Sequence, residues 1–486
     1  MVFMRFGKIF IISTLLLIAA APCTQGRELL DSICSLGLPV MCIETVDHEE
    51  PTCDYISHPA GAMGMGITNA TKVPMSVNIV DWRSGDVIYD SGPYVDGVSG
   101  ATIKIRGNSS AYAAKKPYKI KLQKKGDMLA RGDKRYSDKN WILISDNDVT
   151  TLFGVIISLV MGMTWTPQGL YVNVIFNGDY RGMYLLTEQV KRNNDCRLVT
   201  EKSGFIVEHD PYWWVDDEPY IVSAVHNPSY NYTYKYPEPE DVTEEQAEYI
   251  SAYMNAFDQS VLNGTYPDYI DAASLANWLL AHDILGIQDS GGTNKYFLKA
   301  DDSDSTVLEM PLLWDFDSAM KTAGTWCRIH TGSFGRNYFS NSNKTMVRAY
   351  QRRWRFVSAT LYQEVMSRFD AFVASEQGRG FALSRTADNT RWAIQCTTLT
   401  NFRTRLDSWM SSRVAFLNAN VPALHNNPYA DGDVNEDGTI DGIDLNMVIN
   451  HILGVEKAPV PADCNGDARI DAIDLNIVIN GVLQRQ

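Results

Sequence analysis

Apolar and polar side chains alternate at every second position through much of residues 75–122, which is the pattern of half-buried strands. Beyond Thr243 the period changes, and residues 244–262 and 273–285 carry apolar side chains at helical spacing. Residues 152–163 form an apolar run that is too short to span a membrane and favours a buried helix. Strands followed by helices predict an α+β fold for the larger part of the chain.

The first 24 residues have the pattern of a secretory signal peptide. Arg5 and Lys8 precede an apolar stretch over residues 9–21 that ends in three alanines. Roughly 13 mostly apolar residues are fewer than the ~20 that a spanning helix needs. We therefore expect a secreted or extracellular mature protein with no membrane span.

Charge is distributed unevenly along the 486 residues, which contain 43 basic and 58 acidic side chains. The net charge of −15 argues against a nucleic-acid partner, because a phosphate backbone needs a basic surface. Residues 104–139 nevertheless hold 12 basic and 3 acidic side chains, whereas residues 431–486 hold 11 acidic and 3 basic ones. We therefore expect binding or catalytic sites in these two regions.

The changes of pattern and composition suggest a division of the chain into five parts. We expect a signal peptide at 1–24, an N-terminal appendage at 25–73 and a large catalytic-size domain at 74–421. A His-Asn-Asn-Pro stretch marks a linker at 422–430. The acidic residues 431–486 form a small all-α module.

Two twelve-residue segments of this acidic region have the oxygen spacing of calcium-binding loops. Side chains at positions 1, 3, 5, 9 and 12 and the backbone carbonyl at position 7 supply the ligands of such a loop. The predicted ligands are Asp433, Asn435, Asp437, Thr439, Asp441 and Asp444 in the first loop and Asp463, Asn465, Asp467, Arg469, Asp471 and Asp474 in the second, with Thr439 and Arg469 binding through their carbonyl oxygens. Ala468 occupies position 6 of the second loop, where the first has Gly438, so we expect a more strained turn there.

One amphipathic helix follows each loop, and this loop–helix repeat resembles a type I dockerin. The resemblance implies two bound Ca²⁺ ions and, as a partner, a cohesin domain of a scaffold or cell-surface protein. It also implies a partner-facing surface made from Gly442, Ile443, Ile449, Asn450, Ala472, Ile473, Ile479 and Asn480. The isoleucines could equally belong to the core of the module, and the sequence leaves both interpretations open.

The basic region around residues 101–122 predicts two strands joined by a small polar turn. Gly and Ser in the turn allow backbone amides to approach phosphate oxygens, and a lysine on the following strand can reach them as a point charge. The concentrated positive charge suggests a phosphate-bearing ligand. A lysine-rich hairpin is also common as a solvated sheet face, so this signal is weak alone.

Two later segments have the spacing of a phosphoryl-transfer site. Asp289 follows a helix predicted over residues 272–287 with Asp271 as its cap, and Asn294 comes five residues later, as in the catalytic loop of kinases. An apolar run from residue 310, predicted as a strand, ends at Asp315, whose carboxylate is suited to magnesium. A cationic turn, an Asp-x₄-Asn loop and a strand-end Asp follow in the order that phosphoryl transfer requires.

Residues 106–110 with Lys116-Pro-Tyr, residues 180–188 and residues 313–317 resemble the CotH family of spore-coat-type kinases, over roughly residues 38–421. The resemblance implies an atypical protein-kinase-like fold, ATP with Mg²⁺ or Mn²⁺ as cofactors, and Ser or Thr hydroxyls of an unidentified protein as acceptors. Phe153 and Gly154 stand where members of the family tend to carry an arginine.

Residue roles follow from this resemblance by position. Asp289 would be the catalytic aspartate, Asn294 and Asp315 the metal ligands, and Asp315 a second catalytic residue. Arg106, Ser110 and Lys116 would contact phosphate, with Lys119 as the competing lysine, because Lys119 and Lys121 share one face of their strand. Glu188 or Glu208 would pair with the lysine, or Glu188 would mark the adenine-side hinge.

The leading hypothesis is a secreted phosphotransferase, moving phosphate from ATP to protein Ser or Thr, that is tethered by its dockerin to a cohesin-bearing scaffold. The second is a non-catalytic kinase-like structural or adhesion component of an extracellular, cellulosome-like complex for polysaccharide degradation. Scarce extracellular ATP favours the second hypothesis. The aromatic residues Tyr212, Trp213, Trp214 and Tyr220 could stack on sugar rings, although core packing explains them as well.

Overall fold

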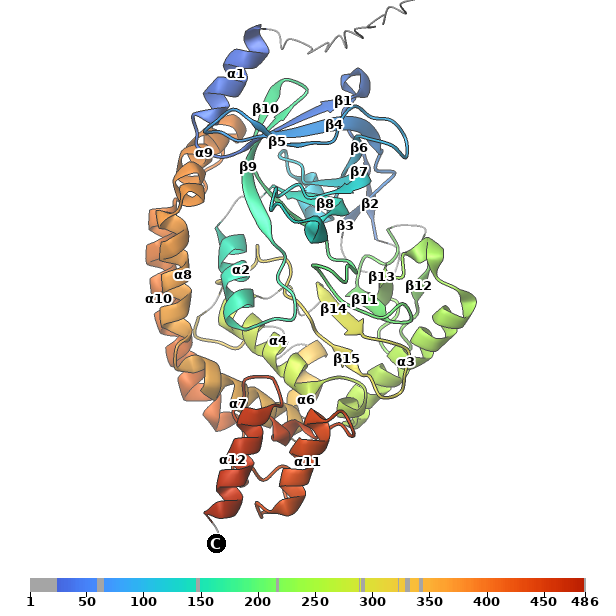
Figure 1. Cartoon of the computed structure of the whole chain (residues 1–486), viewed down its shortest axis with the longest axis vertical. Helices are drawn as coiled ribbons and strands as arrows, with labels where there is room; N and C mark the ends of the chain where they lie inside the picture. The colour runs from blue at the N-terminus through green and yellow to red at the C-terminus, as the bar shows by residue number, and fades with distance from the viewer. Residues whose placement is uncertain are drawn as a thin grey trace, which may run out of the picture.

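The structure is a computed structural model, and it describes residues 24–58, 65–145, 149–215, 218–287, 289, 293–321, 323–327, 333–340 and 344–484. Along the long axis, a barrel-like sheet at one end is followed by a layer of helices with a second sheet, and then by a pair of short helices (Figure 1). The predicted signal peptide lies outside the described residues except for Thr24. No described helix combines the length and apolar character needed to cross a membrane.

The first sheet closes on itself. Its strands are β1 (Val40–Thr45), β4 (Val73–Val80), β5 (Val87–Asp90), β6 (Ala101–Ile105), β7 (Tyr118–Gly126), β8 (Asp138–Ile144), β9 (Gly169–Phe176) and β10 (Asp179–Glu188). They follow the order β1-β9-β10-β8-β7-β6-β4-β5, and an additional β1–β4 pairing completes a barrel-like ring. Ile43, Ile103 and Ile120 are among the residues that fill its interior, so the alternation read from residues 75–122 is confirmed.

The predicted N-terminal appendage is not a separate unit, and this boundary is corrected by the structure. Strand β1 pairs antiparallel with β4 and parallel with β9, so it is needed to close the ring. Helix α1 (Thr24–Cys34) and the hairpin β2 (Asp54–Ser57) with β3 (Met65–Thr68) flank it. Six residues of strand are too short a run for sequence alternation to reveal such a long-range pairing.

The second sheet lies beside the helices and has the order β12-β13-β11-β14-β15. Its strands are β11 (Phe205–Asp210), β12 (Tyr220–Ile221), β13 (Asn231–Tyr236), β14 (Lys295–Lys299) and β15 (Leu308–Glu309). The predicted helices are present as α2 (Thr150–Val160), α3 (Glu244–Asn263) and α4 (Ala272–Leu285). The side chain of Asp271 accepts a hydrogen bond from the Ser274 amide at 2.7 Å, which confirms it as the cap of α4.

The strand predicted to lead into Asp315 is wrong. Ladder pairing between β14 and β15 ends at Glu309, and the following residues run as buried, irregular backbone. Pro311 has no N–H to donate and therefore cannot continue a ladder. Its carbonyl instead accepts a hydrogen bond from Trp165, while Met310 donates to the Ser274 hydroxyl.

The described part of the large domain contains five further helices: α6 (Ser333–Ser340), α7 (Thr345–Ser358), α8 (Leu361–Ala374), α9 (Glu376–Trp392) and α10 (Leu399–Asn420). Helices α8 and α10 form the long left edge of the view in Figure 1. Helix α4 is buried along nearly its whole length, with α7 against one side and α2 against another. It is the central element of the largest apolar core, which explains why its sequence is apolar on all faces.

The C-terminal module lies at the end of the molecule opposite α1 (Figure 1). Its two helices are α11 (Gly442–Ile452) and α12 (Ala472–Leu483), one after each predicted calcium loop. A small core of its own includes Val434, Val448 and Val478. The all-α character predicted for residues 431–486 is confirmed for the described part of the module.

Candidate functional site

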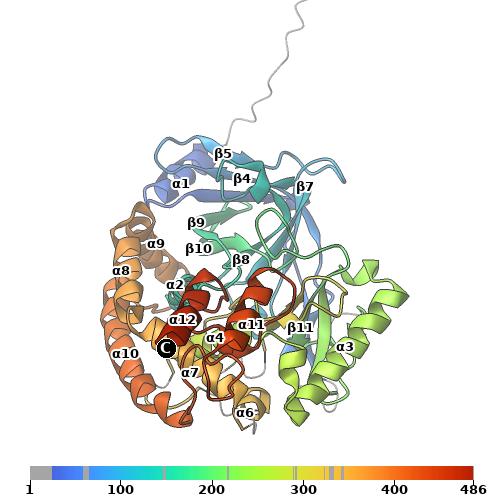
Figure 2. The ribbon, with the colours of Figure 1, turned by 60° about the horizontal axis from the view of Figure 1, so that its bottom comes forward.

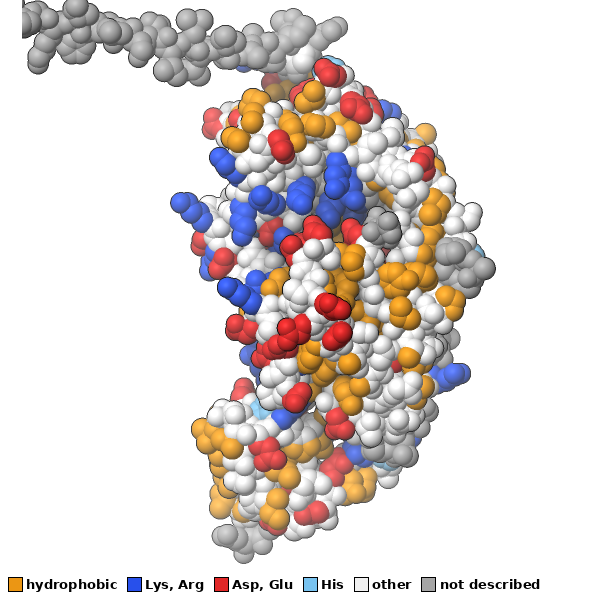
Figure 3. Space-filling model, turned by 90° about the vertical axis from the view of Figure 1, so that its right-hand side faces the viewer, with side chains coloured by type: hydrophobic (Ala, Val, Ile, Leu, Met, Phe, Trp, Pro, Cys, Tyr) orange, Lys and Arg blue, Asp and Glu red, His pale blue; other side chains and the backbone are white. Residues whose placement is uncertain are grey.

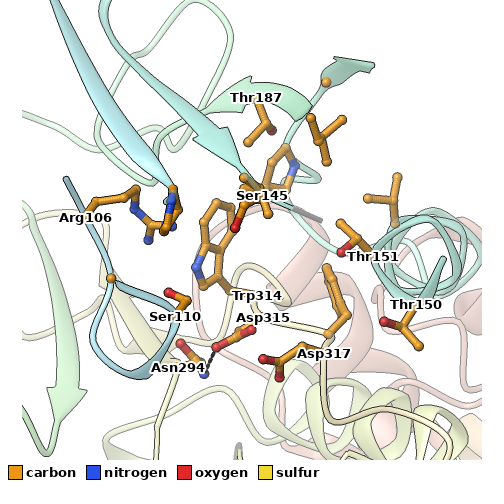
Figure 4. A pocket seen from close by; sticks show the side chains of 18 of the residues that line it. Arg106, Ser110, Ser145, Thr150, Thr151, Thr187, Asn294, Trp314, Asp315 and Asp317 are labelled. Atoms are coloured by element: carbon orange, nitrogen blue, oxygen red, sulfur yellow. Dashed lines mark hydrogen bonds between the residues drawn. The ribbon is translucent and has the colours of Figure 1, made fainter. Parts of the chain in front are cut away.

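A cavity of about 1540 Å³ lies where the closed sheet, the second sheet and helix α2 meet. The turn after β6, the strands β11 and β13, and the segments around Asn294 and Asp315 all contribute to its wall. Figure 3 shows basic side chains gathered in a band on one face of the molecule, directly above acidic ones. Figure 4 shows Arg106 and Ser110 of the turn after β6 on one side of the cavity, near Asn294, Asp315 and Asp317, with residues of α2 across from them.

Asn294 and Asp315 converge in this cavity, as the sequence predicted. The amide Nδ2 of Asn294 lies 3.3 Å from Oδ2 of Asp315, and Figure 4 marks this hydrogen bond. Both residues have left-handed backbone, with φ of 60° for Asn294 and 64° for Asp315. Non-glycine residues held in this region carry strain, and such strain is concentrated at functional sites. Asp289 also lines the cavity.

Several carboxylates face one another in the acidic half of the cavity. Burial raises the pKa of Asp315 to about 7, and the negative charges of Asp317 and Asp289 contribute to the rise, while Arg106 and Asn294 oppose it. Burial and Asp289 also raise the pKa of Asp317. Carboxylates that repel one another in this way would be stabilised by a bound cation.

The residues of this cluster fit a magnesium ion that also binds a substrate phosphate. They offer carboxylate and amide oxygens, which are the ligands that Mg²⁺ prefers. Among the described residues, no three Asp, Glu, His or Cys side chains form a metal site by themselves. Mg²⁺ is commonly held by one or two carboxylates and completes its shell with water and phosphate oxygens.

The basic half of the cavity begins at the turn after β6. Arg106 and Ser110 line the wall, and the negative charges of Asp315 and Glu208 act on Arg106. Gly107 has a φ of 85°, and a Cβ at this position would lie 2.3 Å from Oγ of Ser110. Glycine is therefore required for the tight turn that brings Arg106 and Ser110 together at the mouth of the cavity.

The two predicted lysines are placed differently. Neither lysine is among the residues that line the cavity. The Nζ of Lys116 donates to the Tyr55 hydroxyl at 2.7 Å and to the Ala111 carbonyl at 2.8 Å. Lys119 stands opposite Lys104 in the β6–β7 pairing. Burial lowers the pKa of Lys119 to about 8, and the positive charges of Lys104, Lys235 and Arg106 contribute. The structure thus brings Lys119, and not Lys116, into the group of cations around Arg106.

The two glutamates considered for the lysine also differ. Glu188 is buried away from the cavity wall, with Oε1 2.9 Å from Nη1 of Arg131 and Oε2 accepting from the Gln168 amide at 3.1 Å. Glu208 lines the cavity and pairs with Lys235, Nζ to Oε2, at 3.0 Å. The lysine–glutamate pair of this cavity is therefore Lys235–Glu208, contributed by neighbouring strands β13 and β11.

The sequence motifs did not indicate that Lys235, Asp210 and Asp317 line the cavity. Lys235 had a usable signal, since residues 231–236 alternate and place Lys235 on the face opposite Tyr232 and Tyr234. The alternation shows the face, but the pairing of β13 with β11 that brings Lys235 to Glu208 is a long-range contact that no local pattern reveals.

Phe316 fixes the segment between the two aspartates. Its side chain is buried against helix α2, where a Cβ on Gly154 would lie 2.1 Å from the Phe316 ring. Phe153 and Gly154 stand where the family resemblance suggested an arginine, and the Phe316 ring leaves no room for a side chain at Gly154. Close contact between α2 and Phe316 holds Asp315 and Asp317 at the cavity wall.

In the C-terminal module, carboxylates of each predicted calcium loop accept hydrogen bonds from backbone amides of the same loop. The Asp444 carboxylate accepts hydrogen bonds from the Val434 and Asn435 amides, at 2.7 and 3.1 Å, and Asp474 is bonded in the same way to Cys464 and Asn465. Burial and the charge of Asp474 raise the pKa of Asp463 to about 7. Neighbouring buried carboxylates such as Asp463 and Asp474 are suited to a hard cation such as Ca²⁺. Ala468 has a φ of 71°, so the second loop carries the predicted strain.

Two protein families match separate parts of this chain. Residues 103–375, more than half of the chain, match the family described as CotH kinase protein. The chain belongs to the CotH family. Residues 431–483 match the dockerin type I domain. A search of curated proteins finds no match.

The family match extends from β6 to the end of α8, so the CotH region includes all residues that form the acidic and basic halves of the cavity. Dockerin domains bind calcium and interact with cohesins, and they occur in extracellular or cell-surface complexes. On the dockerin of this CotH protein, Ile443 and Ile473 are each more than half exposed, at 54% and 56%. These two isoleucines belong to the surface of the module and not to its core.

Proposed function

We propose that the CotH domain of this chain is a phosphotransferase that moves the γ-phosphoryl group of ATP to a Ser or Thr hydroxyl of a protein. The observation that carries the proposal is the convergence of Asn294 and Asp315 beside Asp289 in a large cavity with a basic half. Phosphoryl transfer needs this combination, because it depends on positioning and on charge stabilisation more than on covalent chemistry.

The donor side would be held by residues from both halves of the cavity. Asn294 and Asp315 would bind Mg²⁺ or Mn²⁺, which neutralises charge on the phosphates and orients them. Arg106, Lys235 and Lys119 would offset the charge that develops on the transferred group, with Glu208 fixing the position of Lys235. Gly107 allows the backbone of the turn to approach the phosphates closely.

The acceptor side would depend on Asp289. Its carboxylate would orient the acceptor hydroxyl and take its proton as the new O–P bond forms and the bond to the β-phosphate oxygen breaks, releasing ADP. Asp289 follows the buried helix α4, and its amide is 3.4 Å from the Ser318 hydroxyl, three residues after Asp315. This contact ties the proposed base to the proposed metal-binding segment.

The proposal includes a kinase-like architecture for the large domain. The support is a strand-rich part that carries the Gly107 turn and a helix-rich part that carries Asp289, Asn294 and Asp315, with the cavity at their junction. The strand-rich part differs from an open sheet in closing through β1 and β4. The architecture would therefore be an atypical form of the kinase arrangement.

The experiment is a transfer assay with radiolabelled ATP, Mg²⁺ or Mn²⁺ and secreted proteins as acceptors, accompanied by thermal-shift titration with ATP and metal. Asp315→Ala should lose both transfer and nucleotide–metal stabilisation, whereas Asp289→Ala should keep the stabilisation and lose transfer by at least about 100-fold. Asp96→Ala, on the exposed loop after β5, is the control and should behave like the wild type.

Transfer by both variants at the wild-type rate would contradict the assignment. If the wild type shows neither transfer nor stabilisation by ATP and metal, the non-catalytic structural role becomes the better account of the domain.

We further propose that the mature chain is secreted and that the dockerin tethers it to a cohesin-bearing scaffold of a polysaccharide-degrading complex. The exposed Ile443 and Ile473 occupy equivalent positions at the start of α11 and α12, which supports a partner surface on this face. Ile443→Asp together with Ile473→Asp should abolish binding to a cohesin in a pull-down, and unchanged binding would contradict this surface.

A further inference from the structure

Helix α7 of the CotH domain presents arginines to the dockerin. Arg348, Arg352, Arg353 and Arg355 lie within 8 residues of its length. Figure 2 shows the dockerin helices α11 and α12 coming forward over α7 and α4. The dockerin is the most acidic part of the chain, so this contact joins opposite charges.

The first calcium loop contacts α7 through its fourth position. Glu436 is that residue, and its Oε2 lies 2.6 Å from Nη2 of Arg348, with both side chains largely buried. Just before the loop, Asp431 lies 2.9 Å from Nη2 of Arg355 and 3.8 Å from Nε of Arg352. The Glu436–Arg348 and Asp431–Arg355 distances are those of charge-assisted hydrogen bonds, which are stronger than bonds between neutral groups, whereas the Asp431–Arg352 pair at 3.8 Å is an ion pair without a hydrogen bond.

The second calcium loop contacts the same helix through its own fourth position. Gly466 is that residue, and its carbonyl accepts a hydrogen bond from Nη1 of Arg353 at 3.2 Å. A Cβ on Gly466 would lie 2.4 Å from the backbone oxygen of Arg352. The two backbones therefore touch, and this loop fits against α7 only with glycine at position 4.

Arg353 continues the contact into the CotH domain. Its Nε donates to Oδ1 of Asn277 in α4 at 2.7 Å, and its Nη2 donates to the Met161 carbonyl at the end of α2 at 2.6 Å. One guanidinium thus joins the second calcium loop to two buried helices. Gln351 also holds the linker, since its amide donates to the carbonyls of Val421, Pro422 and His425.

The contacts with α7 use loop positions that supply no calcium ligand. Position 4 lies between the ligand positions 3 and 5, so its backbone takes its shape only when the loop is folded. Oxygen-rich loops of this kind need a bound cation to offset the repulsion between their carboxylates, and metal binding is coupled to their folding. Calcium binding and docking on α7 are therefore compatible. By folding the loops, calcium forms the surface that contacts α7.

We propose that α7 is a docking helix for the calcium-loaded dockerin, so that calcium binding and attachment of the dockerin to the CotH domain are thermodynamically linked. Because α7 recognises the folded loops, it raises the calcium affinity of the full chain, and by linkage calcium strengthens the docking. The docked module points its exposed apolar residues Ile443 and Ile473 into solvent, so a partner bound there would hold the CotH domain in a fixed orientation.

The test uses the full-length chain and measures calcium affinity by isothermal titration and cleavage of the 422–430 linker by a protease. Arg348→Glu should lower the calcium affinity about tenfold and make the linker sensitive to cleavage. The exchanged pair Arg348→Glu with Glu436→Arg should restore both properties. Arg368→Glu, at an exposed site on α8, is the matched charge control and should have no effect.

A second pair of variants addresses the same contact without changing charge. Gly466→Ala and Gly454→Ala both place alanine at a left-handed position of the dockerin, but only Gly466 faces α7, and Gly454 lies outside both calcium loops. We expect Gly466→Ala to expose the linker to protease and Gly454→Ala to leave it protected. Wild-type calcium affinity and linker protection in both Arg348→Glu and Gly466→Ala would overturn the proposal, as would failure of the exchanged pair to restore them.

Discussion

The cavity of the CotH domain and the calcium loops of the dockerin are both clusters of oxygen ligands, but they are assembled in opposite ways. Each loop takes its ligands from 12 consecutive residues, and the two loops repeat the same backbone hydrogen bonds to Asp444 and Asp474. The cavity takes its polar residues from positions as far apart as Arg106 and Asp317. A contiguous site can be lost by local unfolding, whereas a dispersed site depends on the whole domain.

Removal of calcium should produce the largest difference in behaviour between the two regions. With EGTA we expect the dockerin to lose its helical structure completely, because its loops cannot fold against uncompensated carboxylates, while the cavity keeps its affinity for nucleotide. Calorimetry with and without EGTA, followed by titration with ATP and Mn²⁺ after exchange into calcium-free buffer, measures both effects. Loss of nucleotide affinity together with the dockerin would show that the two regions are one cooperative unit.

Gly154→Ala should damage the dispersed site through packing alone. The new methyl group would overlap the Phe316 ring, so we expect a loss of about 1–3 kcal/mol in the free energy of unfolding and weaker nucleotide–metal binding. Urea denaturation measures the stability. Gly442→Ala, at the open first position of α11, is the matched control and should be neutral or slightly stabilising. Equal stability of Gly154→Ala and the wild type would contradict the close contact.

The nucleotide affinity of the cavity should fall at high pH, because Lys119 belongs to the group of cations around Arg106. Because burial and neighbouring cations lower the pKa of Lys119 to about 8, its positive charge is present below pH 8 and is lost as the pH rises. Nucleotide affinity should therefore fall between pH 8 and pH 9, by up to about tenfold. In Lys119→Met this part of the pH profile should be flat, whereas Lys121→Met should retain it. Identical profiles for the two variants would remove Lys119 from the phosphate-binding group.

The smallest effect concerns the difference between the two loops. Ala468→Gly relieves the left-handed strain at position 6 of the second loop, which costs on the order of 1 kcal/mol. Calcium affinity of the second loop should rise about fivefold by titration. Gly438→Ala introduces the same strain into the first loop and should lower its affinity by a similar factor. An unchanged affinity in Ala468→Gly would mean that the strain is already relieved elsewhere.

The structure of a region could be predicted from the sequence where it depends on residues that are close together along the chain. The dockerin loops, the cap Asp271 and helix α4 all depend on neighbours within a few turns of chain, and each is present as predicted. The convergence of Asn294 with Asp315 could also be inferred, because the order of the motifs has a mechanistic reason.

The predictions that differ from the structure concern residues whose contacts are distant in the sequence. Lys116 was expected to contact the phosphates of the nucleotide. Its ammonium group instead donates a hydrogen bond to the hydroxyl of Tyr55, which lies in the β2–β3 hairpin. Glu188 was a candidate partner for the lysine, but it forms an ion pair with Arg131. Lys235 lies beside Glu208 only because β13 pairs with β11. The appendage boundary was wrong for the same reason, since β1 finds its partners 30 and more residues away.

The central claim is that Asn294 and Asp315 bind one metal ion together with the phosphates of a nucleotide. A crystal structure of the full chain with Mn²⁺ and a non-hydrolysable ATP analogue, using the anomalous signal of manganese, tests it most directly. We predict a manganese peak within about 2.5 Å of oxygen atoms of both side chains, with the phosphates directed toward Arg106 and Lys235. Manganese and nucleotide bound elsewhere, with Asn294 and Asp315 contacting neither, would contradict the account.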